Sequence, residues 1–297
     1  MLGETKVRSL FGRPRAEVDA ALPDRESVVC PICRHEPRPF GVDFQGLHLA
    51  RCSTCGLEVQ HPRPVFAQLA SAVYGDAYHR PEEALADSFR RRQFRRQLAR
   101  LEQLLPTGRR SALDVGCGAG AFLRFARDRG WKVDGTDIVV TKLARLAGAR
   151  LWDGQLPSIN FDAERQFDVV RFNHVLEHTQ NPLDELRRAR DIIASDGILL
   201  VGVPNLSGVT NQLKHWQSRL HLKLKRWKHY GALHHLWFFN PRTLGKLVKT
   251  AGFDVVYWET PVPARPGRWE DLVRTLVRPP LEAIHGGGLL DLYARAR

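Results

Sequence analysis

Four cysteines near the N-terminus form the pattern with the most specific chemistry in this sequence. They are two Cys-x-x-Cys pairs, Cys30 with Cys33 and Cys52 with Cys55, separated by the 18 residues 34–51. Four thiolates at this spacing predict a zinc ribbon, in which the protein fills every position of a tetrahedral Zn²⁺. Because no position stays open for a substrate, the metal would be structural. Two disulfides or a redox pair are the alternative.

A glycine-rich turn is the second group with recognisable chemistry. The apolar run 111–115 predicts a strand, and residues 121–129 predict a helix. Gly116, Gly118 and Gly120 lie between them. Because glycine has no Cβ, such a turn brings bare backbone and a helix N-terminus against an adenosine-containing ligand. The spacing is G-x-G-x-G, one residue shorter than the dinucleotide fingerprint G-x-G-x-x-G.

Two aspartates accompany this turn. Asp114 lies inside the predicted strand, and Asp137 follows the next predicted strand, 131–136, 21 residues after Gly116 (137 − 116). A carboxylate at the tip of that neighbouring strand can accept hydrogen bonds from both ribose hydroxyls of a nucleoside. The turn and Asp137 together predict a nucleoside site. An ordinary strand–turn–helix with a surface aspartate is the alternative.

Four consecutive motifs carry a resemblance to a known family. L-D-V-G-C-G-A-G-A-F, G-T-D-I, F-D-V-V-R-F-N-H-V-L-E-H-T-Q-N-P and D-G-I-L-L-V-G-V-P-N resemble a class I S-adenosylmethionine-dependent methyltransferase of the methyltransferase domain 23/11 type, from about Ser111 to the C-terminus. The resemblance implies S-adenosylmethionine as the cofactor and an acid, Asp153, facing its adenine amino group. The residues that would bind the cofactor are Asp114, Gly116, Cys117, Gly118, Gly120, Asp137, Ile138, Asp153 and Asn173.

The N-terminal part resembles the zinc ribbon that precedes the catalytic domain in one methyltransferase subgroup. The matching segments are C-P-I-C, L-A-R-C-S-T-C-G-L-E-V-Q-H-P-R-P and Y-G-D-A-Y-H. The resemblance implies a small-molecule, sugar or lipid-linked acceptor. It also implies that Tyr74 and Tyr78 lie near the cofactor cleft. A packing pair at a domain junction is the alternative for these tyrosines.

Histidines cluster in two segments of the predicted catalytic domain. His174 and His178 lie in N-H-V-L-E-H, and His234 and His235 begin H-H-L-W-F-F. Methyl transfer from a sulfonium mainly requires alignment, and a hydroxyl acceptor also requires a base, for which histidine suits neutral pH. The catalytic candidates are therefore His174, His178 and His235. The resemblance places His178 and His235 at the cleft, and anchoring of its loop is the alternative role for His178.

The order of the predicted elements defines the fold class. Strands and helices alternate, which predicts an α/β fold with a doubly wound, mostly parallel, seven-stranded Rossmann-like sheet and a small N-terminal zinc-ribbon module. The resemblance implies that the last two strands close the sheet as an antiparallel hairpin. Ligands bind at the carboxyl edge of such a sheet, where Asp137, residues 173–178 and residues 204–205 fall. Besides those already given, the predicted strands are 149–152, 166–172, 197–203, 253–259 and 289–294, and the predicted helices are 140–147, 182–194, 241–251 and 269–277.

These elements divide the chain into four parts. They are a polar lead-in (1–29), the zinc ribbon (30–66), a helical linker or lid with a basic amphipathic helix over 79–107 (67–110), and the methyltransferase domain (111–297). A basic insertion, residues 205–230, carries an apolar stripe at helical spacing. The stripe consists of Leu213, Trp216, Leu220, Leu224 and Trp227. It predicts a lid or packing helix, a contact with an anionic membrane surface, or a contact with RNA.

Charge and hydropathy limit which partners and which cellular compartment the sequence predicts. The chain has 297 residues, 43% of them hydrophobic, and a formal net charge of +13. No acid lies between Asp196 and Asp254, whereas many Lys and Arg residues do. An anionic partner and a solvated basic face both fit this asymmetry. Without an apolar run of membrane-spanning length or a signal-peptide pattern, the sequence predicts a cytoplasmic protein, peripheral to the inner membrane face if the insertion binds lipid.

The favoured function is methyl transfer from S-adenosylmethionine to a small-molecule, sugar or lipid-linked acceptor, at oxygen. An RNA methyltransferase with the ribbon as an RNA-binding module is the alternative. It is less favoured because the loop that begins at Asn173 reads N-H-V-L and not N-P-P-Y. A non-catalytic binding protein is the third hypothesis, and the intact glycine motif together with Asp137 argues against it. The oligomeric state stays open.

Overall fold

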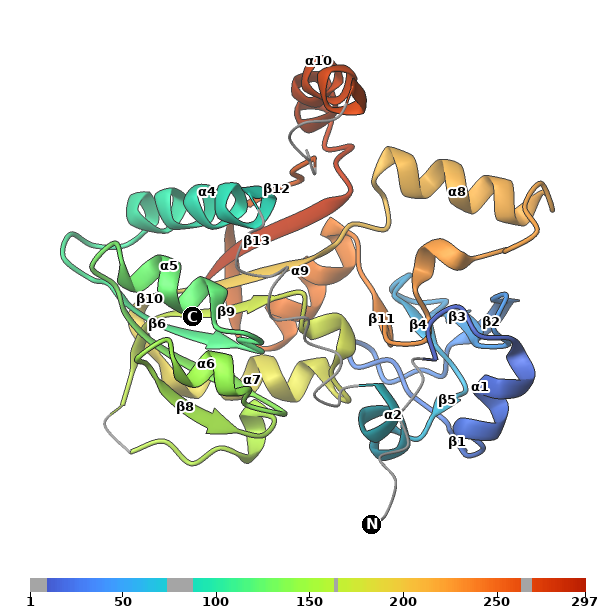
Figure 1. Cartoon of the computed structure of the whole chain (residues 1–297), viewed down its shortest axis with the longest axis horizontal. Helices are drawn as coiled ribbons and strands as arrows, with labels where there is room; N and C mark the ends of the chain where they lie inside the picture. The colour runs from blue at the N-terminus through green and yellow to red at the C-terminus, as the bar shows by residue number, and fades with distance from the viewer. Residues whose placement is uncertain (1–9, 74–87, 163–164, 263–268) are drawn as a thin grey trace, which may run out of the picture.

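The central element of the computed structural model is a seven-stranded sheet (Figure 1). The structure describes residues 10–73, 88–162, 165–262 and 269–297. The strand order is β12-β13-β10-β9-β6-β7-β8. The strands are β6 (Ser111–Val115), β7 (Lys132–Asp137), β8 (Arg150–Asp153), β9 (Phe167–Asn173), β10 (Ile193–Pro204), β12 (Phe253–Glu259) and β13 (Leu289–Ala296).

The pairing directions in this sheet confirm the predicted fold class. β6 to β10 pair in parallel, β13 is antiparallel to β10, and β12 is antiparallel to β13. The last two strands therefore close the sheet as the expected antiparallel hairpin. In β10, residues 198–203 are all buried, which is typical of a strand that helices cover on both faces.

Two layers of helices cover the sheet. One layer holds α4 (Ser88–Leu104), α5 (Ala121–Arg127) and α6 (Lys142–Arg145), which share one hydrophobic core. The other holds α7 (Pro182–Ile192) and α9 (Pro241–Thr250), which pack into a second core with the N-terminal module. The α4 helix is the described part of the helix predicted over 79–107, and residues 79–87 of that prediction lie outside the described residues.

The N-terminal module contains a four-stranded sheet, one strand of which comes from a segment much later in the chain. Its order is β11-β4-β3-β2, and β11 (Trp237–Phe238) pairs antiparallel with β4. The sequence does not predict this pairing, which crosses the proposed boundary between ribbon and catalytic domain. The domain boundaries themselves stay a prediction. The remaining elements are α1 (Arg15–Ala21), β1 (Arg25–Glu26), β2 (Arg38–Val42), β3 (His48–Arg51), β4 (Glu58–Gln60), β5 (Arg63–Pro64) and α2 (Phe66–Val73).

The basic insertion differs from its prediction. The helix α8 (Val209–Arg219) ends long before Trp227, so the predicted stripe is not continuous. Leu224 is fully exposed, whereas Trp227 is buried, with its ring against Phe40. The prediction was wrong at Trp227 because a tertiary contact, and not helical spacing, decides its position. None of the helices among the described residues is long and apolar enough to cross a membrane.

Several other element boundaries are shifted, among them those of α6, which is shorter than the helix predicted over 140–147, and those of two further helices. The helix predicted over 182–194 ends at Ile192, and the next strand begins at Ile193. The helix predicted to end at Val277 continues to Ala283 as α10 (Trp269–Ala283), through two prolines. Both shifts concern ends of elements, where local sequence signals are weakest.

A buried ion pair joins the middle strands to α4. Arg171 on β9 donates from Nη1 to Asp114 on β6 at 2.5 Å, and both side chains are almost fully buried. Its other nitrogens donate to Gln97 Oε1 on α4 at 3.0 and 3.1 Å, and its guanidinium lies 3.9 Å from the Phe122 ring centre. Because β6 carries the glycine turn, this network fixes the strand from which the predicted cofactor site begins.

We predict that Arg171→Met lowers the free energy of unfolding by about 3–5 kcal/mol, since it leaves the Asp114 carboxylate buried without its partner. Urea denaturation measures the change. The control is Arg187→Met, whose ion pair with Asp184 is exposed and should cost less than about 1 kcal/mol. Asp114→Asn added to Arg171→Met should recover part of the loss. Equal stability of the two arginine variants would contradict the role given to the pair.

Candidate active site

A pocket of about 670 Å³ lies at the carboxyl ends of β6, β7 and β9. This is the edge of the sheet at which the sequence predicts the ligand. Five of the sequence-predicted site residues line it: Gly116, Asp137, Ile138, His174 and His178. They come from three different strand ends, so the fold brings the nucleoside candidates and the base candidates together. Their roles as binding or catalytic residues stay predictions.

The glycine turn closes the base of the pocket. The backbone N–H groups of Gly116 and Cys117 both donate to Thr136 O, at 2.7 and 2.9 Å, which ties the turn to β7. Gly116 has φ +69°, and a Cβ there would overlap a methyl group of Val175. Glycine is therefore required at this position for two reasons: the backbone conformation, and the close approach of the loop after β9.

Asp137 ends β7 beside this turn. Its Oδ2 accepts from Gly118 N at 2.8 Å, and its Oδ1 accepts from Val139 N at 3.2 Å. These bonds hold the carboxylate at the pocket wall, where the sequence places the ribose acceptor. Asp153 accepts from Val140 N at 3.0 Å and from Arg145 at 3.4 Å. It lies next to the pocket-lining Gly154 and is not itself in the lining.

Several predicted cofactor residues lie behind the pocket. Asp114 is paired with Arg171, and the Asn173 amide oxygen accepts from Gln93 and Gln97 on α4, at 3.2 and 3.1 Å. These contacts tie the two side chains to neighbouring elements, and neither side chain lines the pocket. The predicted residues outside the lining are Asp114, Cys117, Gly118, Gly120, Asp153, Asn173 and His235.

Other lining residues are absent from the sequence predictions. Gln155 and Leu156 follow Asp153 directly, so the same strand-end argument could have identified them. Phe66 comes from α2 in the N-terminal module, and nothing local in the sequence indicates that it reaches the pocket. The remaining ones are Val115, Thr136, Gly154, Val175, Thr179 and Glu185.

Three histidines meet at the side of the pocket. His178 lies with its ring centre 5.2 Å from that of His234 and 4.9 Å from that of His235. The Nδ1 of His178 is 2.7 Å from His234 O, and the Nδ1 of His235 is 2.8 Å from Tyr230 O. A carbonyl oxygen only accepts, so each Nδ1 carries the proton and each Nε2 is left as an acceptor.

Burial keeps these imidazoles neutral. It lowers the pKa of His178 below its ordinary value, and it lowers the pKa of His235 to about 4. Glu177 is buried beside them, with Oε1 3.3 Å from His174 Nδ1 and 3.9 Å from His178 Nε2. Burial alone would raise the pKa of Glu177, but the His174 hydrogen bond and the positive charge that the neighbouring histidines carry when protonated outweigh it and lower that pKa to about 2. A neutral imidazole next to a carboxylate can accept a proton and be stabilised when it does.

The N-terminal module holds the loop that carries His234 and His235. Gln60 on β4 donates from N to Leu236 O at 2.9 Å and from Nε2 to Ala232 O at 2.8 Å. Tyr230 donates to Glu58 on the same strand at 2.6 Å. The Tyr230 carbonyl in turn accepts from His235. The position of the histidines therefore depends on the β4 strand of the module.

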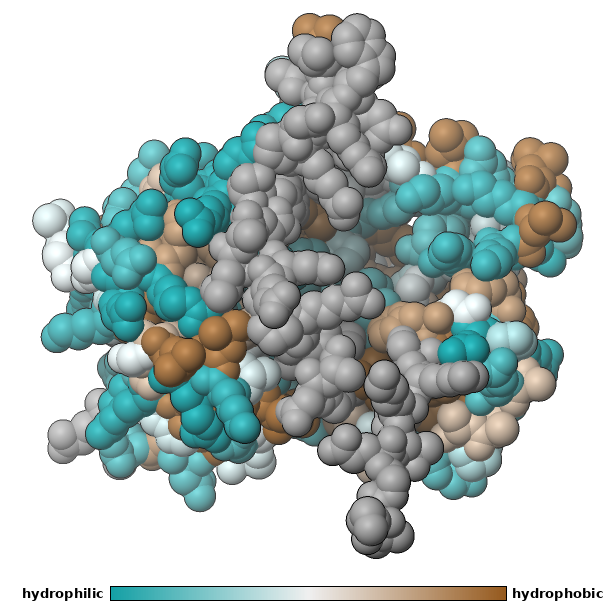
Figure 2. Space-filling model, in the orientation of Figure 1, coloured by the Kyte–Doolittle hydropathy of each residue, from teal (hydrophilic) through white to brown (hydrophobic). Residues whose placement is uncertain are grey.

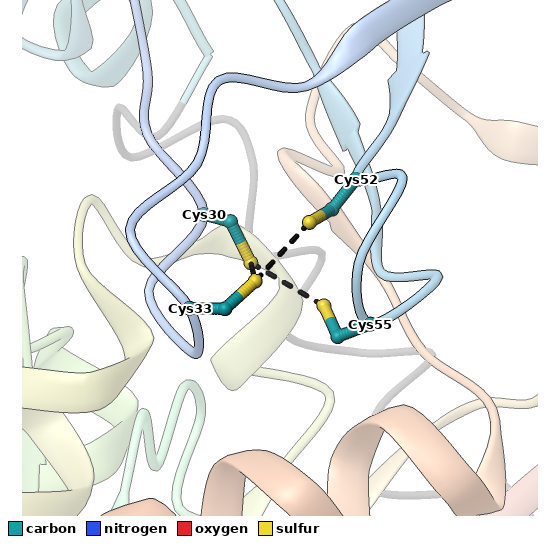
Figure 3. Close-up of side chains that lie close together, drawn as sticks. All are labelled: Cys30, Cys33, Cys52 and Cys55. Carbon is teal, nitrogen blue, oxygen red and sulfur yellow. Dashed lines mark hydrogen bonds between the residues drawn. The ribbon is translucent and has the colours of Figure 1, made fainter.

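The four cysteines predicted to bind metal converge at one point (Figure 3). The sulfur–sulfur distances are 3.4 Å for Cys30–Cys55, 3.6 Å for Cys30–Cys33 and 3.2 Å for Cys33–Cys52, and no pair is disulfide-bonded. Thiolates around a tetrahedral Zn²⁺ lie about 3.8 Å apart, given a Zn–S bond of about 2.3 Å. The donor set and its spacing therefore fit zinc.

The two turns that carry these cysteines have the same geometry. Arg34 N donates to Cys30 O at 2.9 Å, and Gly56 N donates to Cys52 O at 3.0 Å. Arg34 and Gly56 both have positive φ, +61° and +83°. Each turn thus presents two sulfurs to the same side. The two tyrosine candidates, Tyr74 and Tyr78, lie outside the described residues.

The strand order, the glycine turn and the pocket at the carboxyl edge of the sheet define the class of the protein. It is a class I S-adenosylmethionine-dependent methyltransferase with a Rossmann-like fold. Residues 86–257 match the family described as "Methyltransferase domain". The match covers more than half of the chain, so the chain belongs to this family.

Individual relatives are more distant. Two tRNA U34 carboxymethyltransferases, from Shewanella sp. (strain W3-18-1) and Shewanella denitrificans, are each 27% identical over 46% of this chain and 41% of their own length. The chain thus spans about two fifths of the curated relatives that it matches. The crystal structure of Burkholderia thailandensis 1,6-didemethyltoxoflavin-N1-methyltransferase, with its substrate and S-adenosylhomocysteine, is 18% identical with a TM-score of 0.54, covering 87% of this chain and 99% of that one. At this identity the similarity shows the fold.

One carboxyl group in the pocket wall has a strongly raised pKa. Glu185 lies in the first turn of α7, is almost completely buried and lines the pocket. Burial raises its pKa to about 8, although a hydrogen bond with the backbone of Leu156 lowers it in part. The neutral form can donate a hydrogen bond to a ligand, which an ionised carboxylate cannot.

The raised pKa of Glu185 predicts a pH effect on stability. In the unfolded chain its pKa is about 4.3, so between about pH 4.3 and pH 8 the unfolded state loses a proton that the folded state keeps. The contribution of Glu185 to stability therefore falls as pH rises through this window. Glu185→Gln should remove this fall and raise the free energy of unfolding at pH 8 by on the order of 3 kcal/mol relative to the wild type.

Urea denaturation at pH 5 and pH 8 measures this difference. Glu102→Gln, at a half-exposed position on α4, is the matched control and should keep the wild-type dependence on pH. If Glu185→Gln also keeps it, then Glu185 is ionised in the folded protein and its proposed neutral state is wrong.

Proposed function

We propose that this chain transfers a methyl group from S-adenosylmethionine to a hydroxyl group of a small-molecule, sugar or lipid-linked acceptor. The observation that carries the proposal is the position of His178. This neutral imidazole keeps its Nε2 as an acceptor and lines the same pocket as Gly116 and Asp137. A base beside a nucleoside site is the arrangement that methylation of a hydroxyl requires.

The residues of the chain have separate tasks in this proposal. S-adenosylmethionine, when bound, supplies an activated methyl group on a sulfonium sulfur. Asp137 accepts hydrogen bonds from the ribose, and the glycine turn lets the nucleoside lie against the backbone. His178 Nε2 takes the proton of the acceptor hydroxyl as its oxygen bonds to the methyl carbon and the carbon–sulfur bond breaks. The Glu177 carboxylate then stabilises the charged imidazole at 3.9 Å.

The RNA alternative has support from the relatives. Two of them are named as enzymes that act on tRNA U34, and the chain itself is strongly basic. Two observations argue against RNA. The match covers only 41% of the length of these relatives, and the loop after β9 reads N-H-V-L. Methylation of RNA is therefore kept as the second candidate, with the same cofactor and a different acceptor.

The first prediction from this proposal concerns the base. His178→Asn should lower turnover about 10²–10⁴-fold, because an asparagine amide can still donate to His234 O but offers nothing in place of Nε2. The assay is transfer of tritium from labelled cofactor to fractions of a cell extract, separated into organic-soluble molecules, small polar molecules and RNA. The substitution therefore removes the proposed base and keeps the hydrogen bond that anchors the loop.

Cofactor binding by calorimetry and the melting temperature should stay near the wild-type values in this variant. Unchanged turnover would show that His178 only anchors its loop. Label that enters the RNA fraction, and neither of the others, would replace the proposed acceptor with the RNA alternative.

We also propose that Cys30, Cys33, Cys52 and Cys55 hold one structural Zn²⁺. The four sulfurs lie within 4.8 Å of one another and would fill a tetrahedral shell, which leaves the metal no open position for a substrate. Its effect on the active site would be indirect. The β4 strand between the second cysteine pair and β5 pairs with β11, which follows His234 and His235 directly.

The zinc proposal predicts one Zn²⁺ per chain by metal analysis of the purified protein. Cys52→Ser should lose the metal, lower stability and reduce turnover, because the β4–β11 connection loosens when the ribbon unfolds. Cys117→Ala is the control, since Cys117 lies in the glycine turn and outside the cluster, and it should keep the metal. A folded chain without metal would contradict the proposal.

A further inference from the structure

The helix α8 has the reverse of the usual amphipathic arrangement. Its outer stripe is apolar, and Val209, Leu213 and Trp216 expose 45%, 59% and 54% of their surface. Its inner side carries polar residues: Asn211 Nδ2 donates to Asn205 O at 2.9 Å, Ser218 Oγ accepts from Trp227 N at 3.0 Å, and the His215 ring centre lies 5.0 Å from that of Trp227. A helix in water normally turns its apolar side to the protein core. The apolar side of α8 thus faces away from the core.

The exposed apolar surface continues past the end of the helix. Leu220, Leu222 and Leu224 expose 60%, 70% and 104% of their surface in the turn that follows α8. Figure 2 shows apolar surface gathered over this outer end of α8. Scattered apolar residues on a surface are ordinary, but a contiguous group of this size marks a contact site. We call these residues, Val209 to Leu224, the α8 apolar edge.

A hollow lined by lysines lies next to the α8 apolar edge. It has a volume of about 980 Å³, and Lys214, Lys223, Lys225 and Lys228 line it together with Leu222 and Leu224. No acid occurs between Asp196 and Asp254, so the charge of these lysines is not compensated by their own segment. Burial and the charges of His215, Lys214 and Lys223 lower the pKa of His229, at the wall of the hollow, to about 4. The local potential is therefore positive.

We propose that α8 and the turn after it, residues 209–228, dock on the surface of an anionic lipid bilayer. The leucines and Trp216 would enter the boundary between headgroups and acyl chains, and the lysine hollow would take the phosphate groups of the lipids. Amphipathic helices bind membranes through this combination of apolar burial and attraction to anionic lipids. Trp216 is also suited to the interface, with the guanidinium of Arg219 5.7 Å from its ring centre.

The composition of the edge favours lipid over RNA and over a second copy of the chain. RNA binding uses cations together with aromatic rings that stack on bases, and exposed leucines add nothing to such a contact. Two copies of this edge would bring two groups of uncompensated lysines together, which costs energy. An anionic bilayer satisfies the apolar and the basic parts at once.

The docking surface is attached to the catalytic domain at one end and to the ribbon module at the other. Val209 N donates to Gly286 O beside the end of α10, and Tyr230 at the other end contacts Glu58 of the ribbon module. In Figure 1 the helix projects from the body of the molecule. The proposal does not depend on methyl transfer, since it concerns binding in the absence of cofactor and acceptor.

Flotation with lipid vesicles tests the proposal. The full chain should bind vesicles of phosphatidylcholine mixed with phosphatidylglycerol and not vesicles of phosphatidylcholine alone, and added NaCl should weaken the binding. Lys223→Gln with Lys225→Gln should lower the partition coefficient about fivefold for each lysine. Leu220→Ser with Leu224→Ser should lower it at least about tenfold. All four positions are exposed or half-exposed and lie outside the candidate active site.

Leu146→Ser is the matched control, because Leu146 exposes 74% of its surface far from α8 in the sequence, and it should bind as the wild type does. Absence of binding to the anionic vesicles would overturn the proposal. Two further results would overturn it as well: RNA binding that the lysine pair abolishes in a protein that does not bind vesicles, or a dimer in sedimentation that the leucine pair dissociates.

Discussion

The pairing of β11 with β4 is the interaction on which the arrangement of the candidate active site depends. It is short, with Trp237 opposite Val59 and Phe238 opposite Glu58. It nevertheless joins residues separated by most of the chain, and the loop that precedes it carries His234 and His235. A loop on a protein surface is otherwise the most mobile part of a fold, and here it is held by a strand and by the side chains of β4. The ribbon module is therefore part of the construction of the site and not an independent appendage.

Buried polar groups follow the same logic elsewhere in the protein. Asp114 and Arg171 lie between strands that carry the glycine turn and the N-H-V-L-E-H loop, and Gln97 connects them to α4. Such a pair adds little net stability compared with an apolar core, but an unpaired member costs a great deal. As a result, only one alignment of β6, β9 and α4 pairs every polar group of this network. Any other alignment would leave a buried charge without its partner. The sequence cannot show the arginine that pairs with Asp114 across the sheet, and the cofactor-binding role of Asp114 stays a prediction.

The sequence predicts those parts of the fold that depend on local patterns. The bounds of β6 and β12 were predicted without error, since β6 ends directly before Gly116 and β12 lies between Gly252 and Pro261. The seven-stranded sheet, its closing hairpin and the meeting of four cysteines also follow from order and spacing. The contribution of Phe66 to the pocket and the pairing of β11 could not be predicted, because both depend on contacts between distant segments. The continuous stripe to Trp227 failed for the same reason, since a contact with Phe40 outweighs helical spacing there.

The charge of the whole chain says little about the protonation of its candidate base. A net charge of +13 by itself disfavours a further proton on any imidazole, yet burial is the first cause of the lowered pKa of His178, His234 and His235. The acid-free segment 197–253 supplies two of these histidines, and the buried carboxylate beside them, Glu177, comes from another segment, the loop after β9. The candidate base His178 follows Glu177 directly in that loop, and the fold brings both to the carbonyl of His234, which accepts from His178 Nδ1 at 2.7 Å. Because that meeting depends on the β11–β4 pairing, the protonation chemistry of the site is a property of the whole architecture and not of the histidine motif.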